Sequence, residues 1–154
     1  MKRREVLAGA LAAPAALALG VRLFPGPARQ VELVLFNRAI PRAGMAAQRA
    51  GLLGIAALET GGEIAGLLLR QRLFASGGVA LGMTGHAEML LAADIARSAG
   101  RKLIPLAQLG RTDRWFGGAD VQHWKPLALP LLAARADGPQ QTAFAWIVPG
   151  PARS

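Results

Sequence analysis

A short glycine turn in the middle of the chain gathers the residues that could do acid–base chemistry. The turn Gly82-Met83-Thr84-Gly85 leads into His86 and Glu88. On a helical wheel of about 100° per residue with His86 at zero, Glu88 falls at about 200°, on the apolar side of the segment that follows. A carboxylate there loses water and must be held by a hydroxyl or a cation. Glu88 is therefore the candidate general acid or base, with His86 and His123 as its assistants.

These three residues also have simpler interpretations. A glutamate in the first turn of a helix is favoured by the helix dipole and can project into water. His86 and His123 are the only histidines, and they would hold a metal with Glu88 only if the fold brought His123 onto the turn. Because the chain has no cysteine and no HExxH pattern, we predict no metal site. The sequence names no cofactor and leaves open whether the protein is an enzyme.

Two arginines are candidates for binding an anion beside the same turn. Arg38 and Arg42 flank Pro41 just after the first predicted strand. In a parallel sheet they would lie at the same edge as Thr84 and Gly85, where backbone N–H groups can cradle an anion. The glycines lack the spacing of a dinucleotide-binding fingerprint. Solvated arginines, and a turn that needs glycine only for steric reasons, remain the alternative.

The segment Arg111–Lys125 is rich in aromatic side chains and contains a Gly117-Gly118 pair that could act as a hinge. Trp115, Phe116 and Trp124 could pack over a ligand or a partner, as is typical of a long loop with little regular structure. Alternatively, the three rings tuck under the loop and cover the edge of the core.

Composition excludes several chemistries. The absence of cysteine and tyrosine removes disulfides, thiolate metal sites and two kinds of nucleophile, and no serine stands in a GxSxG pattern. The formal net charge is +9. Beyond residue 28 the basic residues are scattered without a run of three, so we expect no nucleic-acid binding.

Five short apolar runs indicate the strands that must position these residues. Runs of this length with few polar interruptions are typical of strands buried on both faces of a sheet. Pro105 favours an edge or a bulge in the fourth run. The predicted strands are Val31–Phe36, Ile64–Leu69, Val79–Met83, Leu103–Leu109 and Ala143–Val148.

Helical segments alternate with these runs. We predict helices over Ala43–Leu58 and His86–Ala99, the second capped by Thr84 and ended by Gly100, and a third over Leu127–Ala136. The alternation predicts a single small α/β domain over residues 29–154, with a mainly parallel sheet of about five strands and flanking helices.

The N-terminus has the organisation of a targeting signal. Basic residues Lys2, Arg3 and Arg4 precede the nearly uncharged stretch Val6–Val21. The order Arg3-Arg4-Glu5-Val6-Leu7 resembles a twin-arginine signal peptide, although Lys2 replaces the usual polar residue. This resemblance covers residues 1–28 alone. It implies a signal helix, cleavage after Ala18 or Ala28, and export of a folded chain by the twin-arginine translocase. A general secretory signal or a retained anchor remains open.

These observations define three functional expectations. The first is an exported periplasmic accessory or binding module, associated with a larger exported or membrane complex. The second is a small periplasmic enzyme that acts on an anionic small molecule through Glu88. The third is a structural subunit held at the inner membrane by its N-terminal helix.

Overall fold

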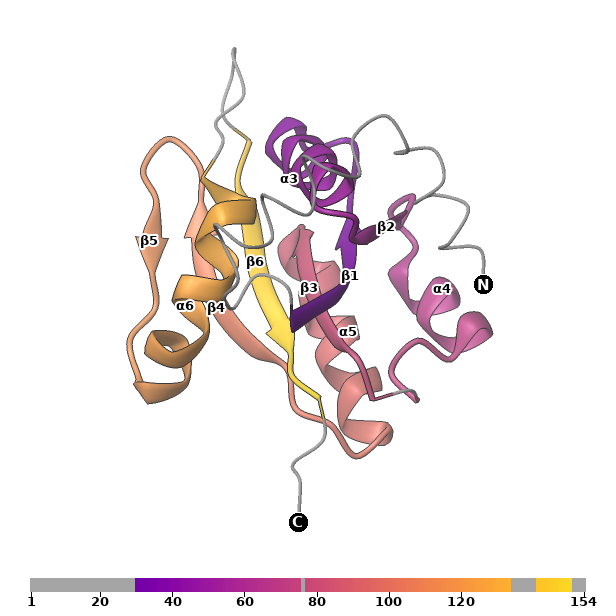
Figure 1. The fold of residues 1–154 in the computed structure, drawn as a ribbon. Coiled ribbons are helices and arrows are strands. Elements are labelled where there is room, and N and C mark those ends of the chain that lie inside the picture. The colour runs from indigo at the N-terminus through magenta and orange to yellow at the C-terminus, as the bar shows by residue number, and fades with distance from the viewer. Residues whose placement is uncertain (1–29, 76, 134–140, 151–154) are drawn as a thin grey trace.

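Six strands form one mixed sheet in the order β2-β1-β3-β6-β4-β5. The computed structural model describes residues 30–75, 77–133 and 141–150 (Figure 1). The strands are β1 (Val31–Phe36), β2 (Ala56–Glu59), β3 (Val79–Thr84), β4 (Ile104–Leu109), β5 (Arg114–Trp115) and β6 (Ala143–Val148).

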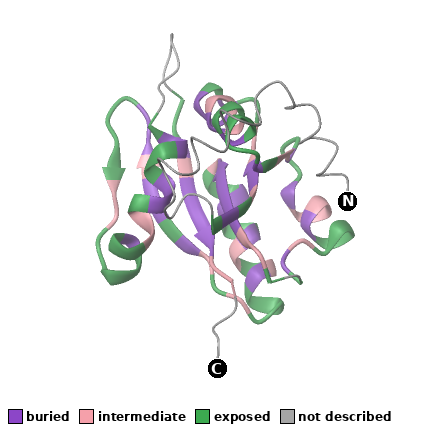
Figure 2. Ribbon diagram, viewed as in Figure 1, coloured by how far each residue is buried: buried purple, intermediate pink, exposed green. Residues whose placement is uncertain are grey.

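Two helices cover each face of this sheet. They are α3 (Pro41–Leu52), α4 (Ile64–Gln71), α5 (His86–Ser98) and α6 (Ala119–Leu132). Helices α3 and α6 pack together over one apolar core, and α4 and α5 pack together over the other (Figure 1). Strands β3 and β6 are buried between the two layers (Figure 2), which explains why their sequences are apolar almost throughout. The predicted single α/β domain is confirmed over the described residues.

Strand direction departs from the prediction of a mainly parallel sheet. Strand β1 pairs in parallel with β2 and β3, but β6 lies antiparallel between β3 and β4, and β5 is antiparallel to β4. The hairpin from β4 to β5 reverses the chain, so α6 returns it to the carboxyl end of β4, where Ala143 pairs with Leu109. Strand β6 therefore starts at the carboxyl end of β4 and runs antiparallel to β3 and β4, so the sheet is mixed.

Three predicted elements were wrong. Ile64–Leu69 is helical, because a short apolar run does not by itself distinguish a strand from a buried helix. The helix predicted over Ala43–Leu58 ends at Leu52; Gly54 then takes a φ of 77°, and β2 follows. The segment Arg111–Lys125 was expected to be largely irregular, but it contains β5 and the first half of α6.

Other local predictions hold. The first and last predicted strands have the predicted bounds, and the register shifts between Pro105 and Ala107, as a bulge at Pro105 requires. Gly100 ends α5 with a φ of 75°. The residue that caps α5 is Gly85 rather than Thr84, because β3 continues through Thr84.

The predicted signal of residues 1–28 and the predicted helical residues 134–136 lie outside the described residues. Within the described ranges, no helix is long and apolar enough to cross a membrane.

Arg101 fastens the end of α5 to the rest of the sheet. Its guanidinium donates hydrogen bonds to the backbone carbonyls of Phe74, Gly78, Val148 and Pro149. Burial lowers the pKa of Arg101 from its ordinary value, and the negative charge of Glu32 offsets part of this effect. One side chain thereby joins β3, β6 and the segment after α4.

Candidate functional site

The carboxyl ends of β1 and β3 form the first candidate region. These neighbouring parallel strands send the chain to opposite faces, β1 into α3 and β3 into α5. In α/β sheets, ligands collect in the crevice that such a divergence leaves. Asn37 follows β1 at this edge, and its N–H donates to the carbonyl of Met83 at 3.2 Å.

Glu88 lies at this edge and points inward, as the helical wheel predicted. It is 7% exposed. Asn37 Nδ2 donates to Glu88 Oε1 at 2.8 Å, and Thr60 Oγ1 donates to Glu88 Oε2 at 2.7 Å. The N–H of Gly85 approaches Oε1 at 3.4 Å. The two carboxylate oxygens of Glu88 therefore connect the loops that follow β1, β2 and β3 through hydrogen bonds. We call Asn37, Thr60 and Glu88 the Glu88 cluster.

Sequence reasoning missed the two partners of Glu88. Asn37 could have been found, because it directly follows a correctly predicted strand at the expected edge. Thr60 could not, because it follows β2, which the sequence analysis had placed inside a helix. In the structure, the N–H of Thr60 donates to the carbonyl of Phe36 at 2.9 Å, which brings the loop after β2 against β1.

The two histidines do not join Glu88. His86 is exposed at the start of α5, with its ring 4.8 Å from that of Phe144. His123 is exposed on α6 and packs edge-on against Trp124 at 4.8 Å. Within the described residues, no three side chains among histidine, aspartate and glutamate lie close enough together to hold a metal ion.

The predicted anion cradle is not assembled. Arg42 is 4% exposed and binds Asp113 through two hydrogen bonds of 2.6 and 2.7 Å, and it also donates to the carbonyl of Leu132 at 3.1 Å. Thr84 is fully buried, and its Oγ1 accepts a hydrogen bond from Trp146 Nε1 at 3.0 Å. Arg38 is exposed, and its backbone N–H donates to Glu59 Oε2 at 3.3 Å. Arg42 thus joins α3 to the β4–β5 hairpin instead of facing the glycine turn.

The aromatic residues of the Arg111–Lys125 segment cover the edge of a core. Trp115, Phe116 and Trp124 are half-buried against the cluster beneath α3 and α6. Lys125 Nζ lies 5.0 Å from the ring centre of Trp115, and the Arg114 guanidinium lies 5.7 Å from that of Phe116. The three rings therefore lie under the segment and cover the edge of the core, which is the alternative that the sequence left open. Phe116 also lines the groove described next.

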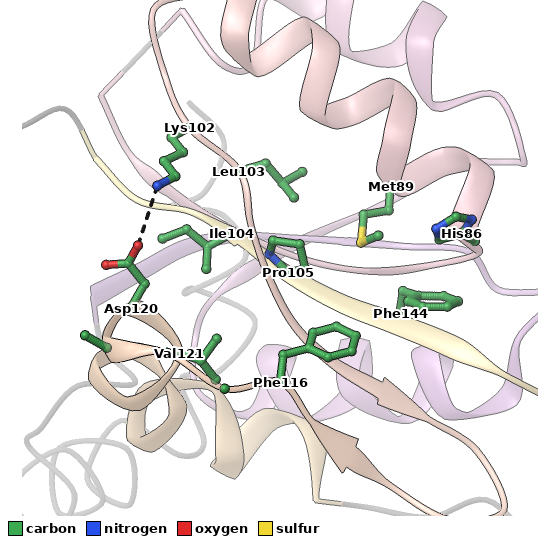
Figure 3. Close-up of a pocket in the computed structure, with 13 residues that line it drawn as sticks. His86, Met89, Lys102, Leu103, Ile104, Pro105, Phe116, Asp120, Val121 and Phe144 are labelled. Carbon is green, nitrogen blue, oxygen red and sulfur yellow. Dashed lines mark ion pairs between the residues drawn. The ribbon is translucent and has the colours of Figure 1, made fainter.

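A groove of about 590 Å³ lies between α5 and the start of α6. We call it the α5 groove. Its walls are largely apolar, with His86 at one end and an ion pair of 3.6 Å between Lys102 and Asp120 at the other (Figure 3). The lining residues are His86, Met89, Lys102, Leu103, Ile104, Pro105, Phe116, Gly117, Gly118, Ala119, Asp120, Val121 and Phe144.

The α5 groove and the Glu88 cluster are separate. His86 is the one candidate catalytic residue that lines the groove, and neither Glu88 nor His123 does. An apolar groove with a few polar groups at its ends has the character of a binding site. Comparison with family models, with curated proteins and with solved structures gives no match for this chain.

Proposed function

We propose that this chain is an exported, non-catalytic binding module that docks onto a protein partner within a larger exported or membrane-associated complex. The observation that carries this proposal is the α5 groove, which opens where no helix of the described residues covers one face of the sheet. Apolar surface of this kind is costly to leave in water and often marks an interaction site.

The two faces of β4 differ in their cover. Helix α6 packs against β4 on one face, whereas α5 packs against β3 and β6 on the other. On the α5 face, Pro105 is exposed and Gln108 and Phe144 are half-buried. A further structural layer on this face would bury them, as α/β architecture requires of an apolar sheet face.

The Glu88 cluster supports a binding role over a catalytic one. A general acid or base must reach the proton that it moves. The carboxylate of Glu88 instead accepts hydrogen bonds from Asn37 and Thr60 and is almost wholly buried. A substrate would have to displace one of these donors.

The export part of the proposal rests on residues 1–28 alone. The pair Arg3-Arg4 before an uncharged stretch supports passage through the twin-arginine translocase and a site of action in the periplasm. Retention of the same segment would hold the module at the inner membrane and keep the groove available to a partner there.

Two exposed leucines provide a matched test of the docking surface. Leu90 is 52% exposed and lies one turn beyond His86 on α5, next to Met89 of the groove. Leu52 is 73% exposed at the end of α3, which covers the other face of the sheet. Because both side chains are largely in water, Leu90→Glu and Leu52→Glu should each change stability by less than about 1 kcal/mol.

The test measures the complex that the tagged full-length protein forms in its native host. The co-purifying partner is identified, purified and titrated against the wild type and both variants by calorimetry. We expect Leu90→Glu to weaken binding at least about tenfold, and Leu52→Glu to leave it unchanged. Absence of any stoichiometric complex, or equal binding by both variants, would contradict the proposal.

A further inference from the structure

The α5 groove extends from the first turn of α5 to the segment that precedes β4. Its lining residues begin with His86 at the first position of α5 and extend to Lys102, beyond the end of that helix. In Figure 3 they lie in a row, with Lys102 and Asp120 at one end, Pro105, Met89 and Phe116 in the middle, and His86 and Phe144 at the other end. Of α5, only His86 and Met89 line the groove, and the segment from Phe116 to Val121 lies across from them.

Among the described residues, the groove has a floor of sheet and one helical wall. Its floor comes from β4 and β6, through Pro105 and Phe144, and one wall is α5, through His86 and Met89. In a layered α/β domain this place beside α5 is normally filled by another helix packed on the sheet. An amphipathic helix would meet such a surface with apolar side chains spaced three and four residues apart.

The charge at the rim selects among occupants. Lys102 and Asp120 compensate each other at one end of the groove. Arg114, whose guanidinium lies over Phe116, has the neutral Gln108 oxygen as its hydrogen-bond acceptor at 3.1 Å. Arg114 does not itself line the groove, but through Phe116 it places one positive charge beside it, which a carboxylate on an occupant would complement.

The same reasoning disfavours occupants supplied by this chain. The chain has a formal net charge of +9, so a second copy brings more positive charge to the rim. The apolar N-terminal stretch Val6–Val21 is preceded by Lys2, Arg3 and Arg4. A second copy of the chain and its N-terminal segment are both positively charged, so neither complements the positive charge beside the groove.

We infer that the α5 groove receives an amphipathic helix of the partner protein, with acidic residues beside its apolar stripe. This inference rests on the proposed function and adds the secondary structure and the charge of the docking segment. The helix completes the layer that α4 and α5 begin. Its apolar side chains contact Met89, Phe116 and Phe144, and its carboxylates face Arg114.

Photo-crosslinking tests the inference in the native host. The full-length protein carries benzoylphenylalanine at position 90, or at position 52 as the matched control, and irradiation is followed by mass spectrometry of the adduct. We expect position 90 to crosslink to a segment of a partner with leucine-like residues at helical spacing and with several acidic residues. Position 52 should give no such adduct. A second copy of this chain, residues 1–28, a basic segment, an extended segment or no adduct would each overturn the inference.

A synthetic peptide of the crosslinked segment then tests its charge and conformation. Circular dichroism should show that the bound peptide is helical, and replacement of its acidic residues by lysine should weaken binding at least tenfold. Arg114→Glu should weaken the native peptide about fivefold and bind the lysine peptide more tightly than the wild type does. Equal binding of both peptides would overturn the inference while leaving the docking function intact. Loss of the distinction between Leu90→Glu and Leu52→Glu would instead overturn the docking function.

Discussion

At the scale of single residues, two buried charged groups hold the carboxyl edge of the sheet together. Glu88 accepts hydrogen bonds from Asn37 and Thr60, and Arg42 forms a two-point ion pair with Asp113. A buried charge is costly unless polar partners replace its water. Each group binds partners from distant elements and so connects loops that are far apart in the sequence. Removing either group should therefore lower the free energy of unfolding.

Asp113→Ala should be strongly destabilising. It leaves the guanidinium of Arg42, which is 4% exposed, without its carboxylate. Loss of one partner of a buried pair costs about 3–5 kcal/mol, and we expect about 3 kcal/mol because Asp113 is itself 30% exposed. Urea denaturation followed by circular dichroism measures the change.

Asp94→Ala is the matched control. Asp94 and Arg97 form an ion pair whose side chains are 69% and 75% exposed. Exposed pairs of this kind contribute less than about 0.5 kcal/mol. If the two alanine variants unfold at the same urea concentration, the Arg42–Asp113 pair stabilises the fold no more than an exposed pair does.

At the scale of elements, strand β3 accommodates the indole ring of Trp146 on the neighbouring strand β6. Trp146 on β6 is fully buried, and it donates a hydrogen bond to Thr84 and lies against Gly82 of the neighbouring strand β3. A Cβ at position 82 would lie 2.0 Å from the ring. The glycine in β3 therefore makes room for the largest side chain of the core.

Gly82→Ala should lower the free energy of unfolding by at least about 3 kcal/mol, because neither β3 nor Trp146 can move without breaking pairs in the middle of the sheet. Gly44→Ala is the control: Gly44 is in α3, and a Cβ there would meet no atom within 4 Å. Alanine favours a helix over glycine, so this variant should be stabilised by about 0.5 kcal/mol. Thermal unfolding should show a lower stability for Gly82→Ala and a slightly higher stability for Gly44→Ala. Destabilisation by both substitutions would refute the steric explanation.

The elements also explain how far the sequence could lead. The runs Val31–Phe36 and Ala143–Val148 are strands with the predicted bounds, because their β-forming residues are packed on both sides. The run IAGLLL at Ile64–Leu69 has the same apolar character but forms α4, since burial of Ile64 and Leu68 on one side suffices for a helix.

Apolar composition alone did not distinguish α4 from the strands. The runs Val79–Met83 and Leu103–Leu109 have one β-branched residue each, like IAGLLL, but they contribute to β3 and β4. Burial was also overestimated in α4, where Leu69 is 63% exposed.

The direction of a strand in the sheet and the partners of a side chain cannot be predicted from the local sequence. The antiparallel course of β6 follows from the β4–β5 hairpin, and β5 has only two residues. The inward orientation of Glu88 was predictable from helical periodicity, but its partner Thr60 depends on β2 lying beside β1. Arg42 was expected to face an anion, and the structure gives it Asp113, which lies 71 residues further along the chain.

At the scale of the whole molecule, the proposed function assigns export to residues 1–28 and partner binding to the described domain. Residues 1–28 carry four basic residues and one acidic residue around an uncharged stretch. The remaining basic residues are spread over the domain, whose apolar surface includes the α5 groove. The twin-arginine resemblance implies export of a folded chain, in which case the groove would already be formed when the protein crosses the membrane.

The double substitution Arg3→Lys with Arg4→Lys separates the two export routes. Lysine keeps the positive charge that a general secretory signal needs, but it loses the planar guanidinium groups that distinguish the twin-arginine pair. We expect the amount of protein in the periplasm to fall at least about tenfold, with the full-length chain accumulating in the cytoplasm. Cell fractionation followed by intact-mass measurement records both pools, and a general secretory protein serves as the control. Undiminished export of the double variant would assign the chain to the general secretory route, and the groove would then form only after translocation.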